Sequence, residues 1–277
     1  MQESAEEKEF RSLAGKIRVG VIEQLRAFGQ GHIGGAMSIA DTLAVLYGGV
    51  MFVDPKNPAN PKRDRLVLSK GHAGPALYAA LCERGFFPRE WLGTLNQGGT
   101  HLPSHCDRTK TPGVDVTTGS LGQGASVAAG LALGAKLRGE DYTTYLIVGD
   151  GECNEGQVWE AVMFAAHHKL GNLVAFVDWN KQQLDGYTEN VMANGSFEEK
   201  LRAFGWNAVT VNGHDTAAIF AAITAAKEDT NKPSAIILDT VKGKGAFFAE
   251  GVEFNHSMSV SGEQAERAIA EITEAAR

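Results

Sequence analysis

Five short apolar runs along the chain predict its strands. They lie at residues 66–69, 145–148, 173–177, 208–211 and 235–238. The second and third runs contain no charged residue, which is typical of strands that are buried on both faces of a parallel sheet. The runs therefore predict a mainly parallel sheet.

Segments of helical periodicity separate these runs. Leu13, Ile17, Val21 and Leu25 recur at a spacing of four, as on the buried face of a helix. Helices are predicted at 4–28, 38–51, 74–84, 124–138, 155–170, 194–204 and 216–227, and a last one follows 261. Serines that precede Glu, Asp or Gln by three positions predict helix caps at Ser4, Ser38, Ser196 and Ser261.

The alternation of strands and helices indicates an α/β fold, with a mainly parallel sheet and helices on both faces. No internal repeat or shift in composition marks a boundary, so residues 1–277 are predicted to form a single domain. Residues 93–112 are irregular, and loops of that length are often functional.

Two of the predicted strand ends carry oxygen ligands. The run at 145–148 ends at Gly149-Asp150-Gly151, and the run at 173–177 leads to Asn180. Parallel strands joined by a crossover helix end on the same edge of the sheet, so Asp150 and Asn180 are expected to meet there. A carboxylate, an amide oxygen and a nearby backbone carbonyl suit Mg²⁺ or Ca²⁺, and Mg²⁺ often takes further ligands from phosphate. The pattern predicts a metal site that anchors a diphosphate.

Histidines follow strand or helix ends in four loops, at His32, His72, His105 and His256. Histidine titrates near neutrality, so it can bind phosphate, donate to an alkoxide or move a proton. A single loop histidine is more often a surface residue, but four beside one metal motif favour a shared site. The remaining histidines are interpreted as structural or exposed: His101, His167, His168 and His214.

Composition narrows the class of protein. The chain of 277 residues is 43% hydrophobic and 21% charged. Its formal charge is −7, and its charged residues do not gather into a basic face, so nucleic acid is not an expected partner. Three widely spaced cysteines argue against a disulfide framework and a zinc site. The acidic amino terminus is unlike a signal peptide, and no apolar run is long enough to span a membrane. A cytoplasmic location is expected.

Five ordered motifs resemble the amino-terminal half of transketolase. They are GHIGG, RDRLVLSKGHA, PGVDVTTGSLGQG, GDGECNEG with Asn180, and VKGKG with a later histidine, and they extend from about residue 10 to 260. The resemblance implies the thiamine-diphosphate-binding fold and the transfer of a two-carbon ketol unit from a ketose phosphate to an aldose.

The resemblance also implies roles for individual residues. The metal, Mg²⁺ with Ca²⁺ or Mn²⁺ as alternatives, would be bound by Asp150, Asn180 and the backbone carbonyl of Gln182. Thiamine diphosphate would contact His72, Gly119, Ser120, Leu121, Gly151, Glu152, Asn180 and His256. The catalytic histidines, which would face the sugar, are His32, His105 and His256. Glu155 would join a carboxylate network near a subunit interface.

Three positions depart from the usual pattern of the family. Cys106 replaces a proline, Gln182 replaces a small or apolar residue, and Phe254-Asn255-His256-Ser257 replaces Trp-His-Gly. A backbone ligand tolerates the change at Gln182. The other two changes are expected to reshape the sugar pocket, so the usual pentulose phosphate is not assured as the substrate.

The family also uses a second, pyrimidine-binding domain, which supplies an activating glutamate and the arginines that grip the sugar phosphate. The chain ends at Arg277, so this domain is expected on a separate carboxy-terminal subunit, with two copies of each chain. Two alternatives remain open. One is half of another thiamine enzyme, such as deoxyxylulose-phosphate synthase or a 2-oxo-acid dehydrogenase component. The other is a non-catalytic cofactor-binding scaffold.

Overall fold

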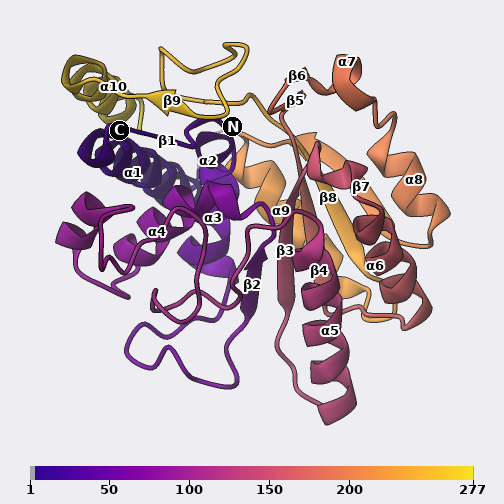
Figure 1. The fold of residues 1–277 in the computed structure, drawn as a ribbon. Helices are drawn as coiled ribbons and strands as arrows, with labels where there is room; N and C mark the ends of the chain where they lie inside the picture. Colours follow the sequence, from indigo (N-terminus) through magenta and orange to yellow (C-terminus); the bar gives the residue numbers. More distant parts are fainter. Residues whose placement is uncertain (1–3, 277) are drawn as a thin grey trace.

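A five-stranded parallel sheet lies at the centre of the computed structural model, which describes residues 4–276 (Figure 1). In spatial order the strands are β2 (Arg65–Leu68), β3 (Thr144–Gly149), β4 (Leu173–Trp179), β8 (Ser234–Asp239) and β7 (Asn207–Asn212). Every neighbouring pair is parallel. The five predicted strands are confirmed, each with bounds that differ by a few residues at most.

The strands β2, β3, β4 and β8 are buried on both faces, whereas the edge strand β7 is largely exposed. Alternate residues of each strand point to opposite faces of the sheet. On β3, Tyr145 and Ile147 belong to one hydrophobic cluster, and Leu146 and Val148 belong to the other. The continuous apolar runs of the sequence follow directly from this two-sided burial.

Helices cover the two faces (Figure 1). One side holds α1 (Ala5–Phe28), α3 (Ala40–Val45), α4 (Gly74–Glu83), α9 (Thr216–Glu228) and α10 (Gly262–Ala275). The other holds α5 (Gln123–Arg138), α6 (Gly156–His167) and α8 (Phe197–Ala203). The predicted α/β fold with helices on both faces of a parallel sheet is confirmed.

Three of the four predicted caps are present. Ser4 and Glu7 form a capping box on α1, and Ser261 and Gln264 form one on α10. The Ser196 hydroxyl accepts a hydrogen bond from the backbone of Glu199, so α8 begins at Phe197 rather than at 194.

The helix predicted to start at Ser38 is wrong in its start and its continuity. The backbone is already helical in α2 (Gly34–Ser38), and α3 is followed by a π-helical turn at Leu46–Val50. Ser38 is buried, and its hydroxyl donates to Asp178 at 2.6 Å instead of capping a helix. A tertiary partner therefore takes the hydroxyl that the local pattern assigned to a cap.

Short elements gather at the carboxyl edge of the sheet, along the top of Figure 1. β1 (Gln30–Gly31) pairs antiparallel with β9 (Met258–Ser259), and β5 (Gln182–Gln183) pairs with β6 (Gly186–Tyr187) ahead of α7 (Thr188–Met192). The β1–β9 pair brings the loop of His256 beside the loop of His32. Short 3₁₀ helices occur at Gly71–Ala73, Arg89–Thr94 and Glu152–Asn154.

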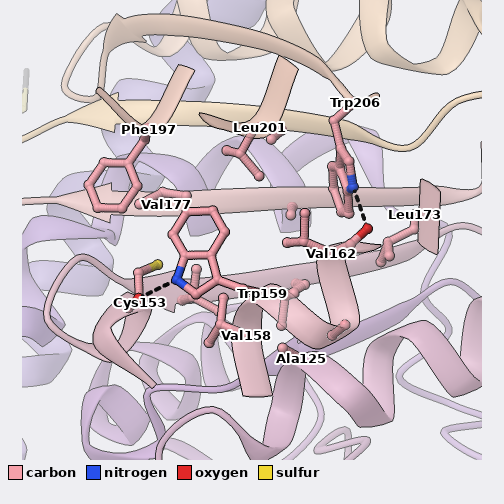
Figure 2. Close-up of a pocket in the computed structure, with 15 residues that line it drawn as sticks. Ala125, Cys153, Val158, Trp159, Val162, Leu173, Val177, Phe197, Leu201 and Trp206 are labelled. Atoms are coloured by element: carbon pink, nitrogen blue, oxygen red, sulfur yellow. Dashed lines mark hydrogen bonds between the residues drawn. The ribbon is translucent and has the colours of Figure 1, made fainter. Parts of the chain in front are cut away.

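The layer between the sheet and α6 and α8 contains a small apolar cavity of about 30 Å³ (Figure 2). Trp159 donates its indole N–H to Cys153 O at 2.8 Å, and Trp206 donates to Val162 O at 2.9 Å. The lining is apolar apart from the buried thiol of Cys153, and burial raises the pKa of that thiol well above its usual value, which disfavours the reactive thiolate. Within residues 4–276, no helix has both the length and the apolar character that a membrane crossing requires.

Candidate active site

A second cavity, of about 400 Å³, opens at the carboxyl edge of the sheet. Its walls come from the loops that follow β2, β3, β4 and β8, together with the GHIGG segment. Parallel strands carry such loops to one edge, so residues that are distant in sequence converge there.

Asp150 and Asn180 meet in this cavity. Asp150 is 2% exposed, and its carboxylate accepts hydrogen bonds from the backbone of Gly151 and Lys181, both at 2.8 Å, and from Thr188. Burial, and after it the nearby charge of Asp178, raises the pKa of Asp150 to about 6. A bound cation would offset both effects, because it would stabilise the charged carboxylate.

Asp178 determines the orientation of the Asn180 side-chain amide. The Asp178 carboxylate is fully buried and accepts hydrogen bonds from Lys70 Nζ and, at 2.9 Å, from Asn180 Nδ2. With Nδ2 committed to Asp178, the amide oxygen of Asn180 lies on the other side, 3.2 Å from the backbone nitrogen of Gln182. Although burial raises the pKa of Asp178, Lys70 and the hydrogen bonds outweigh it and hold that pKa below its usual value.

The residues present fit a divalent cation that carries a diphosphate. Asp150, Asn180 and the carbonyl of Gln182 supply hard oxygen atoms, which Mg²⁺ prefers. The side-chain oxygen of Gln182 is buried and has no hydrogen-bond partner among the described residues. At Gly151 a Cβ atom would lie 2.8 Å from Gln183 Cγ, so a larger residue here would require the Gln183 side chain to shift.

The four loop histidines form one cluster. The ring centroid of His32 lies 5.5 Å from those of His72 and His105 and 5.2 Å from that of His256, and His72 and His256 are 4.6 Å apart. Burial lowers the pKa of all four, to about 3 for His256, where Lys242 adds to the effect. The rings are therefore neutral at pH 7, able to donate and accept hydrogen bonds rather than act as cations.

Two lysines that the sequence interpretation missed also line the cavity. Lys70 is buried between Asp178 and the carbonyl of Gly35, which lies 2.8 Å from Nζ. Lys242 Nζ lies 3.1 Å from the carbonyl of Gln183 and 3.4 Å from that of Gln182. Burial, followed by the charge of Lys70, lowers the pKa of Lys242 to about 8. The sequence contained a signal for both lysines, because each lies just past the end of a predicted strand, in KGHA and in VKGKG.

The other predicted cofactor residues differ in their placement. Gly119 and Leu121 line the cavity, whereas Ser120 between them is exposed and does not. The Glu152 carboxylate is buried and binds Ser69, Gly122 N and Gly149 N, so its oxygen atoms are used within the protein.

Among the residues of the two departures expected to reshape the pocket, Cys106, Phe254 and Asn255 lie outside the cavity lining, whereas His256 is part of it. Cys106 is 1% exposed and does not line the cavity; burial raises the pKa of its thiol to about 12. Asn255 is fully buried, and its amide donates to the carbonyls of Lys242 and Ala249. Phe254 is 61% exposed, with a left-handed backbone at φ 64°.

The remaining histidines lie outside the cavity. His101 stacks on Trp91, and His167 and His168 pack against each other at the end of α6. His214 hydrogen-bonds to Asp41.

Comparison with known proteins identifies the family. Residues 10–272 match the family model described as the transketolase thiamine diphosphate binding domain. The chain belongs to the transketolase family.

Two relatives of matching length are named as transketolase subunits. The chain is 50% identical over 269 residues to the 6-deoxy-6-sulfo-D-fructose transketolase subunit SqwG of Clostridium sp. strain MSTE9, covering 97% of this chain and 98% of that one. It is 41% identical to an apulose-4-phosphate transketolase subunit of Phocaeicola vulgatus, covering 88% of this chain and 86% of that one. This transketolase chain is the amino-terminal subunit of a split transferase that moves a two-carbon ketol unit, and it acts with a partner subunit.

Solved transketolases share the fold. The Campylobacter jejuni transketolase superposes with a TM-score of 0.89 at 32% identity over 96% of this chain. This chain covers 42% of that chain, so it spans less than half of its length.

Proposed function

We propose that residues 1–277 form one domain that binds thiamine diphosphate through a divalent cation, Mg²⁺ in the first instance. Asp150, the amide oxygen of Asn180 and the carbonyl of Gln182 would hold the cation. The bound cofactor supplies the electron sink for cleavage of a carbon–carbon bond. The observation that carries the proposal is the meeting of these three oxygen donors beside the histidine cluster.

Lys242 and His72 serve the diphosphate in this proposal. Lys242 Nζ lies beside the carbonyls of Gln182 and Gln183, so its charge is placed at the cation end of the cavity. His72 is partly buried, its pKa is lowered chiefly by burial, and the neutral ring can donate a hydrogen bond without adding charge. Gly119, Leu121 and the backbone at Gly151 and Glu152 would line the rest of the cofactor.

His32, His105 and His256 serve the sugar. Their pKa values are lowered by burial, so at neutral pH each ring donates one hydrogen bond and accepts another. Neutral rings can polarise the hydroxyls and carbonyl of a ketose and pass a proton between them as the bond breaks.

The partner would be a carboxy-terminal subunit with the pyrimidine-binding domain, two copies of each chain forming the enzyme. Among the described residues that line the cavity, the only ammonium groups are those of Lys70 and Lys242. Both are directed at the cation end, so the terminal anion of the sugar needs basic residues of the partner. Glu155, at the rim of the cavity, would lie near the subunit interface.

The substrate would be a ketose with an anionic terminal group. The name of the SqwG relative specifies a sulfonated fructose. At 50% identity over nearly the whole chain, 6-deoxy-6-sulfo-D-fructose is the donor that we propose first, with ketose phosphates as the alternative.

Two measurements test the proposal. Titration calorimetry with thiamine diphosphate should show binding that requires Mg²⁺ and is lost in Asp150→Ala. Mixed with the companion subunit of the SqwG enzyme, the chain should transfer a two-carbon unit from sulfofructose to an aldose faster than from fructose 6-phosphate. Mg²⁺-independent binding, or consumption of pyruvate instead of a ketose, would overturn it.

A further inference from the structure

A largely buried charge network lies outside the cavity lining. Asp41 of α3 accepts hydrogen bonds from both terminal nitrogens of Arg18 of α1, one of them at 3.0 Å. One oxygen of the same carboxylate also accepts from Nδ1 of His214 at 2.8 Å. The three side chains are at most 15% exposed. The network therefore joins two helices to the turn that follows β7.

His214 continues the network to the loop after β8. Its Nε2 accepts the backbone N–H of Val241 at 2.9 Å. A backbone amide can only donate, so Nε2 carries no proton, and the ring proton sits on Nδ1 and points to Asp41. Both ring nitrogens are thus used, and the ring bridges the helices and the loop.

Asp41 keeps this tautomer in place. Burial alone would raise the pKa of Asp41, but Arg18 and His214 outweigh it and lower that pKa. The carboxylate therefore stays charged and continues to accept from Nδ1. Arg18 also binds the loop directly, because its Nε donates to the carbonyl of Lys244 at 3.1 Å.

The loop is held on its other side by the GHIGG segment and by Asn255. Gly243 N donates to Gly34 O at 3.0 Å, and the Asn255 amide donates to Lys242 O at 3.1 Å. The backbone from 241 to 244 is thus bonded on both sides. Its side chain at Lys242 lines the cavity, as does His256 further along the same loop.

We propose that His214 is a positioning residue, which together with Asp41 and Arg18 holds the 241–244 backbone so that Lys242 faces the diphosphate end of the cavity. The proposal rests on the function proposed above only where it assigns the diphosphate to Lys242. His214 itself does not line the cavity, so it acts through Val241.

Two substitutions of His214 distinguish the hydrogen bond of Nδ1 to Asp41 from that of Nε2 to Val241. His214→Asn places an amide nitrogen near the position of Nδ1, which can still donate to Asp41, but it offers nothing to Val241 N–H. His214→Gln is longer, and its amide oxygen can accept from Val241. His167→Asn, at an exposed position on α6, is the matched control.

Hydrogen exchange of the full chain tests the contact without cofactor or partner. In His214→Asn, amides at 241–249 should exchange about 10-fold faster, as expected when one hydrogen bond is lost and its donor is left unpaired. His214→Gln and the control should stay near wild type. Unchanged exchange at 241–249 in His214→Asn, or equal acceleration over the whole chain, would overturn the proposal.

Kinetics of the complex with the partner subunit test the consequence. His214→Asn should raise the KM for thiamine diphosphate about 10-fold. The kcat at saturating cofactor should change by less than about 3-fold, and His214→Gln should restore the KM. Faster exchange with an unchanged KM would mean that the contact is merely structural, against the proposal. If the wild-type chain fails to bind thiamine diphosphate, the proposed function falls, and the exchange result alone decides whether His214 holds the loop.

Discussion

At the scale of single residues, burial shifts the pKa values of two residues in the cavity in opposite directions. It raises the pKa of Asp150 to about 6 and lowers that of His256 to about 3. In both cases the charged form is disfavoured, because transfer out of water costs free energy. The consequences for pH dependence have opposite signs.

Asp150 should make cofactor binding depend on pH. Its folded pKa lies above its unfolded value of 3.8, so the stability it contributes is present below pH 4 and is lost as the pH rises through about 6. A cation reverses that loss, so Mg²⁺-dependent binding of thiamine diphosphate should strengthen from pH 5 to 7.5. Calorimetry across this range should show the rise in the wild type.

The matched variant is Asp150→Asn, which has no carboxyl group to titrate. Its affinity should fall by at least about 100-fold, beyond the range caused by loss of an outer partner. If the affinity of this variant for thiamine diphosphate still rises with pH, a group other than Asp150 is responsible for the pH dependence.

His256 should contribute to acid sensitivity. Its folded pKa lies below 6.5, so the stability it contributes is present above pH 6.5 and is lost as the pH falls below that value. His256→Asn should therefore lose less unfolding free energy than the wild type between pH 7 and pH 5. Urea unfolding at both pH values measures the difference, with the exposed variant His167→Asn as the control. Equal losses in the wild type and in His256→Asn would contradict the assignment.

At the scale of elements, local signals hold where the helix end is exposed and fail where a tertiary partner intervenes. Ser261 caps α10 in a box with Gln264 at an exposed helix end. Ser38 has the same local pattern, but its hydroxyl is buried against Asp178. The two serines differ in their exposure to solvent. At an exposed helix end the serine hydroxyl binds the backbone N–H of the first turn, whereas in the core it binds a buried carboxylate, which forms a stronger hydrogen bond.

Removal of the α10 cap should have a measurable cost. Ser261→Ala should lower the free energy of unfolding by about 1 kcal/mol, because it leaves a backbone N–H of the first turn without its partner. Chemical denaturation measures the change, and Ser12→Ala, inside α1, should be close to neutral. A cost below about 0.3 kcal/mol would mean that water replaces the cap completely.

At the scale of the whole molecule, the positive charges among the described residues that line the cavity are two ammonium groups, those of Lys70 and Lys242, and both already have partners within the chain. Lys70 is paired with Asp178, and Lys242 lies on the carbonyls beside Asn180. The choice between a sulfonate and a phosphate should therefore follow the partner subunit.

Exchange of the partner tests this division. The chain paired with the companion of SqwG should prefer sulfofructose, and paired with the companion of the apulose-4-phosphate enzyme it should prefer a ketose phosphate. Ratios of kcat/KM for the two donors measure the preference, and size-exclusion chromatography confirms that each pair has assembled. If both pairs assemble and the ratio of kcat/KM for the two donors is the same in each, this chain determines the specificity.

The sequence alone determined the sheet, its helical layers and the sheet edge at which Asp150 and Asn180 meet. Continuous apolar runs mean burial on both faces, and parallel strands end together, so the proximity of Asp150 and Asn180 followed from spacing. The clustering of His32, His72, His105 and His256 was expected from loops at strand ends, and the structure brings the four rings together.

Only the tertiary structure decided the partners of individual polar groups. The orientation of the Asn180 amide depends on Asp178, and the tautomer of His214 depends on Asp41 and Val241. The placement of Lys242 on two carbonyls and the burial of Cys106 and Asn255 belong to the same class. Periodicity reports which face of an element is buried, whereas a hydrogen bond depends on which distant side chain arrives within about 3 Å.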